Sequence, residues 1–179
     1  MGEKQLIKDL KSDKEEAYIE LINLYGNRLA RTLFLMTKDK SEAEDIVQET
    51  FIRVFKNIKN FRGNSSIYTW IYRISQNIAK DRFAAKNSST AYEDSIELSQ
   101  DNIEEIIITG IDREILRMEI DRLKFLYKQV IVLFYFEDLT IREISEILEE
   151  KETTIRSKLH RGRKLLKKAL QEGGRLNGW

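Results

Sequence analysis

Apolar residues recur every three or four positions along most of the chain, a spacing that places them on one face of an α-helix. Polar and charged residues fill the positions between them, as on the solvent side of amphipathic helices. This pattern predicts an all-α protein. The apolar stripes run over residues 17–36, 43–58, 67–78, 123–136, 141–148 and 155–169.

Several stripes follow residues that favour a helix start. A serine or threonine with a glutamate three positions later can form a capping box, in which each side chain accepts a hydrogen bond from the other residue's backbone N–H. Ser65 or Ser66 should cap the third helix, which is predicted to reach about Lys86, and Thr153 or Thr154 should cap the last. Capping boxes are predicted for Ser12 with Glu15, Ser41 with Glu44 and Thr140 with Glu143.

The composition is typical of helices and argues against several classes of function. Of the 179 residues, 34% are charged, none is Pro and 8 are Gly, which disfavours a fold of short strands and tight turns. With no Cys there is no disulfide framework or thiolate zinc site, and a single His excludes a multi-histidine metal site. No catalytic arrangement and no phosphate-binding glycine loop emerges. We therefore predict no enzyme activity, no cofactor and no metal.

Charge divides the chain into segments. Residues 87–112 contain acidic side chains and no Lys or Arg, as expected of a solvated tether. Residues 151–168 carry eight Lys or Arg and one Glu, a net charge of +7, whereas the whole chain carries +1, so the rest carries −6. We predict two small helical domains, residues 1–86 and 113–170, joined by a flexible acidic linker at 87–112 and followed by a tail at 171–179.

The last two stripes predict a helix-turn-helix, because a short helix, a polar break and a basic helix follow one another. The side of the final helix opposite its apolar stripe should enter a DNA major groove, and lysines farther along should neutralise phosphates. A solvated basic face at an ordinary helix end is the alternative, since cations suit that end of the helix dipole. Predicted base readers are Arg156, Ser157, His160 and Arg161, and predicted phosphate contacts are Lys164, Lys167 and Lys168.

The second predicted helix carries an isoleucine on its polar face. Ile52 shares that face with Asp45, Gln48 and Glu49, at spacings of one and two helical turns. An apolar side chain at such a position suggests a protein partner, although single surface isoleucines are also common.

The segment FRGNSSIYTWIYRISQNIAKDR, residues 61–82, interleaves aromatic and basic side chains. Single-stranded nucleic acid is bound by this combination, because rings stack on unpaired bases and cations follow the backbone. Residues 62–66 are the best candidates, since a loop can wrap around a flipped base. Trp70 fits a position in the core equally well.

Three motifs in this order resemble those of bacterial sigma factors of the extracytoplasmic-function type, the two-domain group of the sigma-70 family. SEAEDIVQETFIRVF, residues 41–55, resembles the polymerase-binding helix of the family, and residues 61–82 resemble its promoter-melting segment. LTIREISEILEEKETTIRSKLHRGRKLL, residues 139–166, resembles its C-terminal helix-turn-helix. The resemblance covers nearly the whole chain and implies sigma region 2 at residues 1–86 and sigma region 4 at 113–170.

The resemblance also implies a partner for each surface. The face with Asp45, Gln48, Glu49 and Ile52 would dock on the clamp helices of the largest subunit of core RNA polymerase, and region 4 would meet the flap of the second-largest subunit. The final helix would read the minus-35 element of promoter DNA. The residues that would capture an unpaired base of the minus-10 element are Phe61, Arg62, Gly63, Asn64, Ser65, Ser66, Tyr68 and Asn77.

Such a factor would be monomeric when free and would pair with an anti-sigma factor. No apolar run approaches the roughly 20 residues that span a bilayer, so we expect no membrane insertion and a cytoplasmic location. The alternative is an autonomous helix-turn-helix regulator whose first domain dimerises or senses a signal; it would bind palindromic half-sites as a dimer.

The sequence departs from the family pattern at two places. The family usually has Pro near Lys124, and it has Gly followed by an apolar residue where Glu149 and Glu150 stand. These departures concern the helix boundaries and the turn before the predicted DNA-reading helix.

Overall fold

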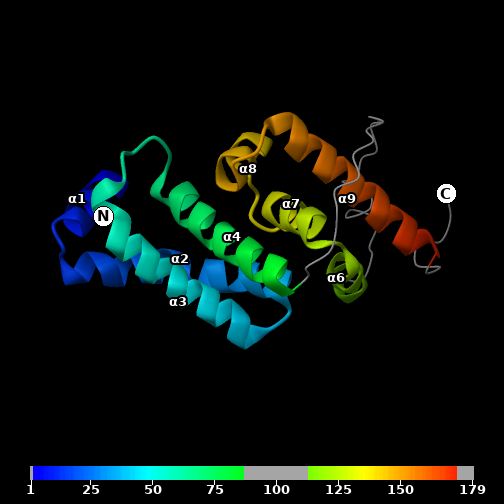
Figure 1. Ribbon diagram of the computed structural model, residues 1–179, viewed down its shortest axis with the longest axis horizontal. Helices are drawn as coiled ribbons and strands as arrows, with labels where there is room; N and C mark the ends of the chain where they lie inside the picture. The colour runs from blue at the N-terminus through cyan, green and yellow to red at the C-terminus, as the bar shows by residue number, and fades with distance from the viewer. Residues whose placement is uncertain (1, 87–112, 173–179) are drawn as a thin grey trace. The chain divides into compact units, whose positions relative to one another are not determined.

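The computed structural model describes residues 2–86 and 113–172, and all regular structure in those ranges is helical, which confirms the all-α prediction (Figure 1). The helices are α1 (Glu3–Lys11), α2 (Glu15–Thr37), α3 (Lys40–Asn57), the short 3-10 helix η1 (Ile58–Asn60), α4 (Ile67–Lys86), α6 (Arg113–Arg122), α7 (Phe125–Tyr135), α8 (Ile141–Leu148) and α9 (Glu152–Glu172).

The chain forms two compact units, the first containing α1 to α4 and the second containing α6, α7, α9 and the start of α8. The linker predicted at 87–112 lies outside the described residues, as does the predicted tail from residue 173 onward. The other two residues of that tail belong to α9.

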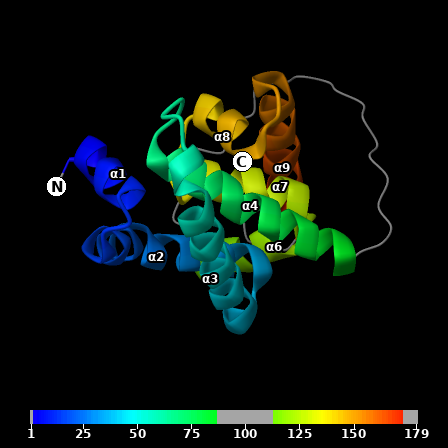
Figure 2. The same cartoon turned by 60° about the vertical axis from the view of Figure 1, so that its left-hand side comes forward.

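The core of the first unit lies between α2, α3 and α4, and α3 packs against both of the other helices (Figure 2). Each helix turns its apolar stripe inward, because burial of Leu, Ile and Val side chains removes apolar surface from water. The predicted stripes supply most of this core, with Ile46 as an addition to the stripe of α3 and Tyr72 as an addition to that of α4. Fully buried side chains include Leu29, Leu33, Ile46, Val54, Ile71 and Tyr72.

Two of the predicted helix starts are confirmed. The hydroxyl of Ser66 accepts a hydrogen bond from the backbone N–H of Thr69 over 3.0 Å, and α4 starts at the next residue. At the start of α8, Thr140 Oγ1 accepts from the Glu143 backbone N–H over 3.2 Å, while Glu143 accepts from the Thr140 N–H over 2.8 Å. This reciprocal pair is the capping box predicted there.

The other two predicted capping boxes are wrong. Ser12 ends α1 instead of starting a helix, because its backbone N–H bonds to the carbonyls of Lys8 and Asp9, and α2 starts at Glu15 without a side-chain cap. The cap of α3 is Asp39, whose carboxylate accepts from the Glu42 N–H over 3.0 Å. A strong cap two residues before Ser41 places Ser41 inside the helix.

The start predicted for the last helix is also wrong, by two or three residues. Helix α9 starts at Glu152, so both threonines lie inside its first turn. A glutamate in that turn suits the positive end of the helix dipole.

The second unit is built on the packing of α7 against α9. Gly162 permits the close approach: a Cβ at this position would lie 3.0 Å from Ile131 Cγ1. The predicted stripe of α9 is confirmed at Ile155, Leu159, Gly162 and Leu166, but its last member is Leu170, which is fully buried, and not Ala169. Ile115 and Leu116 of α6 pack against Leu170, and this contact makes Leu170, and not Ala169, the last buried residue of the stripe.

The turn after α8 places a glutamate where the backbone conformation favours glycine. Glu149 has a φ of 55°, and the Glu150 backbone N–H bonds to the Ser145 carbonyl over 3.1 Å. This pattern closes a helix end with one residue in the left-handed region, which favours glycine. A glutamate there carries backbone strain.

We expect Glu149→Gly to stabilise the packing of α8 and α9 by about 0.5–1 kcal/mol, since relief of the left-handed strain exceeds the entropy that glycine adds to the unfolded chain. Urea unfolding monitored on the amide resonances of α9 measures the change. Glu146→Gly, inside α8, is the control and should destabilise these helices by about 1 kcal/mol. A stabilising effect at both positions would contradict the explanation from backbone strain.

Candidate functional site

The outer face of α3 exposes the predicted isoleucine. Ile52 retains 50% of its accessible surface, and Asp45 and Gln48 on the same face are exposed. The predicted exposure of Ile52 is thereby confirmed. An apolar side chain on the same face as two polar ones offers a partner both burial energy and directional hydrogen bonds.

Glu49, the fourth predicted residue of this face, is bound within the unit. Its carboxylate accepts hydrogen bonds from Arg53 of the same helix and, over 2.8 Å, from Arg82 of α4. The Arg82 guanidinium, together with that of Arg53, holds the pKa of Glu49 below its usual value. Glu49 therefore joins α3 to α4 as well as adding to the face. Beside it lies a pocket of about 490 Å³ lined by Asp39, Ser41, Glu42, Asp45, Arg82 and Ala85.

The lowered pKa of Glu49 predicts a dependence of stability on pH. Its ion pairs stabilise the folded chain fully above the unfolded pKa near 4.5 and lose this effect as the pH falls through the lower folded value. We expect Glu49→Gln to cost less than about 1 kcal/mol near pH 7, because the Glu49 side chain is 33% exposed. The difference from wild type should shrink as the pH falls below about 4.5, as measured by urea unfolding at several pH values. A difference that is constant across this range would contradict the assignment.

The loop between η1 and α4 presents a short polar segment. Arg62, Gly63 and Asn64 are exposed, and Gly63 has a φ of 72°, a conformation that favours glycine. Phe61 is only 5% exposed, and its ring centroid lies 5.0 Å from that of the half-buried Trp70. Phe61 therefore supports the loop from inside, while its neighbours face solvent.

Tyr68 and Asn77 on α4 are half-buried. The Arg28 guanidinium lies 4.6 Å from the centre of the Tyr68 ring, and the ring of Tyr72 lies 4.4 Å from it. Arg28, on α2, is a neighbour of the predicted site that the sequence analysis missed. Its cation–π contact with a residue 40 positions away has no local signal in the sequence.

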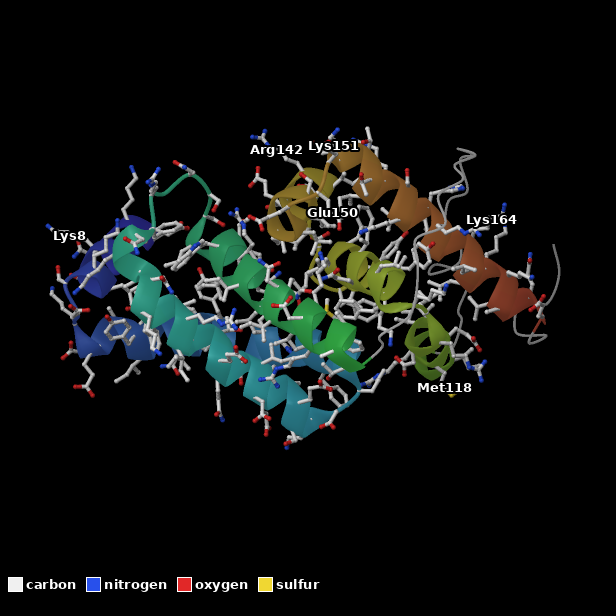
Figure 3. All side chains as sticks on the ribbon, viewed as in Figure 1. Lys8, Met118, Arg142, Glu150, Lys151 and Lys164 are labelled. Carbon is white, nitrogen blue, oxygen red and sulfur yellow. The ribbon has the colours of Figure 1, made fainter. Side chains whose placement is uncertain are left out.

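The predicted reading face of α9 is accessible. Arg156 and Arg161 are exposed, while Ser157 and His160 are half-buried. Arg156 lies 3.4 Å from Glu152 in an exposed pair, which holds the side chain only weakly. Farther along, Lys164 and Lys168 are exposed and Lys167 is half-buried, and Figure 3 shows Lys164 projecting outward from α9.

Two other cations of α9 point into the unit. The ammonium of Lys158 lies 2.5 Å from Glu150 Oε2, and the Lys158 side chain is only 8% exposed. The Arg163 guanidinium lies 5.3 Å from the Phe134 ring and 5.5 Å from the Tyr135 ring. The basic segment is therefore divided between a solvent-facing part and a part that packs the unit. Lys158 follows Ile155 by three positions and precedes Leu159, and that position in the apolar stripe was a signal for its burial.

Within the described ranges, no group of three or more His, Cys, Asp or Glu side chains is arranged to hold a metal ion. None of the described helices combines the length and the apolar character needed to cross a membrane.

Comparison with known proteins assigns both units. Residues 21–89 match the family model of sigma-70 region 2, and residues 113–166 match that of sigma-70 region 4. The chain is 30% identical to the ECF RNA polymerase sigma factor SigW of Bacillus subtilis over 181 residues, which cover 94% of this chain and 97% of SigW. The chain belongs to the extracytoplasmic-function sigma factors of the sigma-70 family.

Further relatives agree with this assignment. The ECF RNA polymerase sigma-E factor of Haemophilus influenzae is 28% identical, with 96% of each chain covered. The fold matches that of CnrH, solved with the cytosolic domain of CnrY, with a TM-score of 0.70 and 20% identity over 95% of this chain and 97% of that one. It also matches RpoE of Bartonella quintana, solved with the anti-sigma factor NepR, with a TM-score of 0.65 and 17% identity over 86% and 96%.

The protein is thus an alternative RNA polymerase sigma factor. The sigma assignment accounts for both units, whereas an autonomous helix-turn-helix regulator would leave the match to region 2 without a role. Helix α1 lies before the matched part of region 2.

Proposed function

We propose that the outer face of α3 binds the clamp helices of the largest polymerase subunit, with Asp45, Gln48 and Ile52 in contact and Glu49 at the edge. The half-exposed Ile52 carries this proposal, because its burial by a partner would recover apolar surface that the isolated unit leaves in water. Region 4 would meet the flap of the second-largest subunit.

In the same proposal, the loop after η1 captures an unpaired base of the minus-10 element. Arg62, Asn64 and Ser65 offer polar groups, Gly63 lets the backbone approach a base, and Phe61 supports the loop from below. Ser66 caps the start of α4. Tyr68 and Asn77 are the half-buried residues of α4 that would contact the captured base. Binding of the unpaired base would favour the open duplex, because a ligand shifts an equilibrium towards the state it binds.

Helix α9 would read the minus-35 element as duplex. Arg156, Ser157, His160 and Arg161 would face the base edges, and Lys164, Lys167 and Lys168 would contact phosphates. Since CnrH and RpoE were each solved with a partner, CnrY and NepR, this chain is also proposed to pair with an anti-sigma factor.

A factor of this kind would supply binding and positioning, with no chemistry of its own and no cofactor. It would be monomeric when free and would act in the cytoplasm, where bacterial polymerase meets DNA. The acidic segment 87–112 would follow basic channels of the polymerase.

The test is run-off transcription by core polymerase, with and without this protein, on a library of promoters. We expect transcripts from a defined subset of promoters only when the protein is present. A protein that does not bind core polymerase, or that binds DNA as a dimer without it, would overturn the proposal.

The division of α9 into base readers and phosphate contacts gives its own prediction. Arg161→Ala should relax sequence preference at one or two minus-35 positions, worth about 1–3 kcal/mol of discrimination. Lys164→Ala should weaken binding to all sequences and reduce the slope of log affinity against log salt by about 0.9. Both are measured with holoenzyme on the selected promoter and its minus-35 variants at several salt concentrations. Equal, sequence-independent effects of the two changes would refute this division.

A further inference from the structure

Helix α1 contacts both ends of the loop that precedes α4. The Lys11 ammonium donates a hydrogen bond to the carbonyl oxygen of Phe61 over 2.7 Å. The Glu3 carboxylate accepts one from the backbone N–H of Ile67 over 3.0 Å. One short helix thus contacts the residue before and the residue after the loop 62–66. The loop residues themselves are exposed or half-exposed.

Helix α1 is itself firmly attached to the first unit. Leu6 and Leu10 are buried, with 2% and no exposed surface. Asp13, just after the helix, pairs with Lys59 of η1 at 2.5 Å and accepts a hydrogen bond from Tyr18 of α2 over 2.8 Å. These contacts make α1 a fixed support, because its apolar side is packed and its end is joined to two neighbouring helices.

The two contacts satisfy a backbone group at each end of the loop. The N–H of Ile67 is the first of α4, where no preceding turn offers a carbonyl. A carboxylate at that place is also favoured by the positive end of the helix dipole. Ser66 serves the N–H of Thr69, so the start of α4 has one cap from the loop and one from α1. With Phe61 buried and both ends fixed, only the middle of the loop is left to adapt.

We propose that α1 acts as a clamp that positions the minus-10 loop, with Glu3 and Lys11 as its positioning residues. The clamp rests on the proposed function, in which this loop captures an unpaired base. It adds a helix that lies before the matched part of region 2 and that contacts no DNA in this scheme. A loop held at both ends needs less ordering when a base enters, so the clamp would increase affinity for the captured base.

The test compares variants that keep or remove each hydrogen bond. Glu3→Ala and Lys11→Met, singly and together, remove the contacts, whereas Glu3→Gln keeps an acceptor and Lys11→Arg keeps a donor. Lys8→Ala is the matched control, since Lys8 is exposed on the same helix and projects away from the unit in Figure 3.

The readout is the affinity of holoenzyme for a fluorescent single-stranded oligonucleotide that carries the minus-10 strand of the selected promoter. Each nucleotide is replaced in turn by an abasic one. In wild type, the captured position should show a loss of about 5- to 150-fold. The quantity compared between variants is the ratio of the affinity for the intact oligonucleotide to the affinity for the one that is abasic at the captured position. A variant that is merely less folded lowers the active fraction equally for both oligonucleotides, so this ratio reports loop positioning alone.

For the double variant, we expect this ratio to fall below about 3-fold, while affinity for core polymerase stays within about 2-fold of wild type. The conservative pair Glu3→Gln and Lys11→Arg should restore most of the ratio, and Lys8→Ala should leave it unchanged. An unchanged ratio in the double variant, or an equal fall in Lys8→Ala, would overturn the clamp while leaving the proposed function intact. Absence of any abasic effect in wild type would instead overturn the assignment of the loop as the base-capturing segment.

Discussion

Ile52→Lys should weaken binding of this sigma factor to core polymerase by about 100-fold. The isoleucine is half-exposed in the free chain, so a lysine there leaves the folded unit intact. In the proposed complex, the change would remove apolar burial and place a charge where water is excluded, which costs free energy only in the bound state. Binding of labelled protein to core polymerase, followed by fluorescence anisotropy, measures the loss.

Ile19→Lys provides the matched control for Ile52→Lys. Ile19 on α2 is 53% exposed against 50% for Ile52, so both changes remove a similar amount of surface apolar area from the free protein. We expect the control to stay within about 3-fold of wild type. An equal loss in both variants would show that the effect is not specific to α3, and no loss in Ile52→Lys would reject the α3 face as the docking surface.

Glu150→Ala should lower the free energy of unfolding of the second unit by about 2–4 kcal/mol. The Lys158 side chain is 8% exposed and its ammonium lies 2.5 Å from Glu150. In Figure 3 Glu150 lies on the inner side of the turn before α9, whereas Lys151 projects outward. Removal of the carboxylate leaves an ammonium with little access to water and without its closest counter-charge.

The double change Glu150→Ala with Lys158→Met should recover most of this loss, because a methionine fills the position without a charge. Glu152→Ala, which breaks an exposed pair with Arg156, is the control and should cost less than about 1 kcal/mol. Urea unfolding monitored on the α9 amides measures all three. If the single and double changes at 150 and 158 cost the same, the pair does not act as a unit.

The body of α4 and the outer face of α3 were largely predictable from the sequence. Helix α4 is bounded by Ser66 and Lys86 as expected, because its start depends on a local serine cap and its body on an uninterrupted apolar stripe. The exposure of Ile52 followed from helical spacing alone. These features depend on residues within one or two turns of each other.

The features that the sequence analysis missed depend on contacts between distant parts of the chain. Helix α1 has a short stripe among charged residues, and its importance lies in Lys11 and Glu3, which contact backbone groups 50 and 64 positions away. Phe61 is next to an arginine in a polar loop, yet the ring of Trp70 covers it. Lys158 belongs to a basic run, but the turn brings Glu150 to it. No local pattern contains that information.

The packing of α9 on α7 depends on Gly162, whereas the residues proposed to read DNA lie on the exposed side of α9. A Cβ there would lie 3.0 Å from Ile131, so the register of α9 on α7 is set by a position that faces away from solvent. Arg156 and Arg161 can then be exchanged without disturbance of that register. This factor is for that reason a suitable scaffold for reprogramming: a library randomised at the proposed reading positions, with the glycine retained, should yield orthogonal variants that each open a different set of promoters.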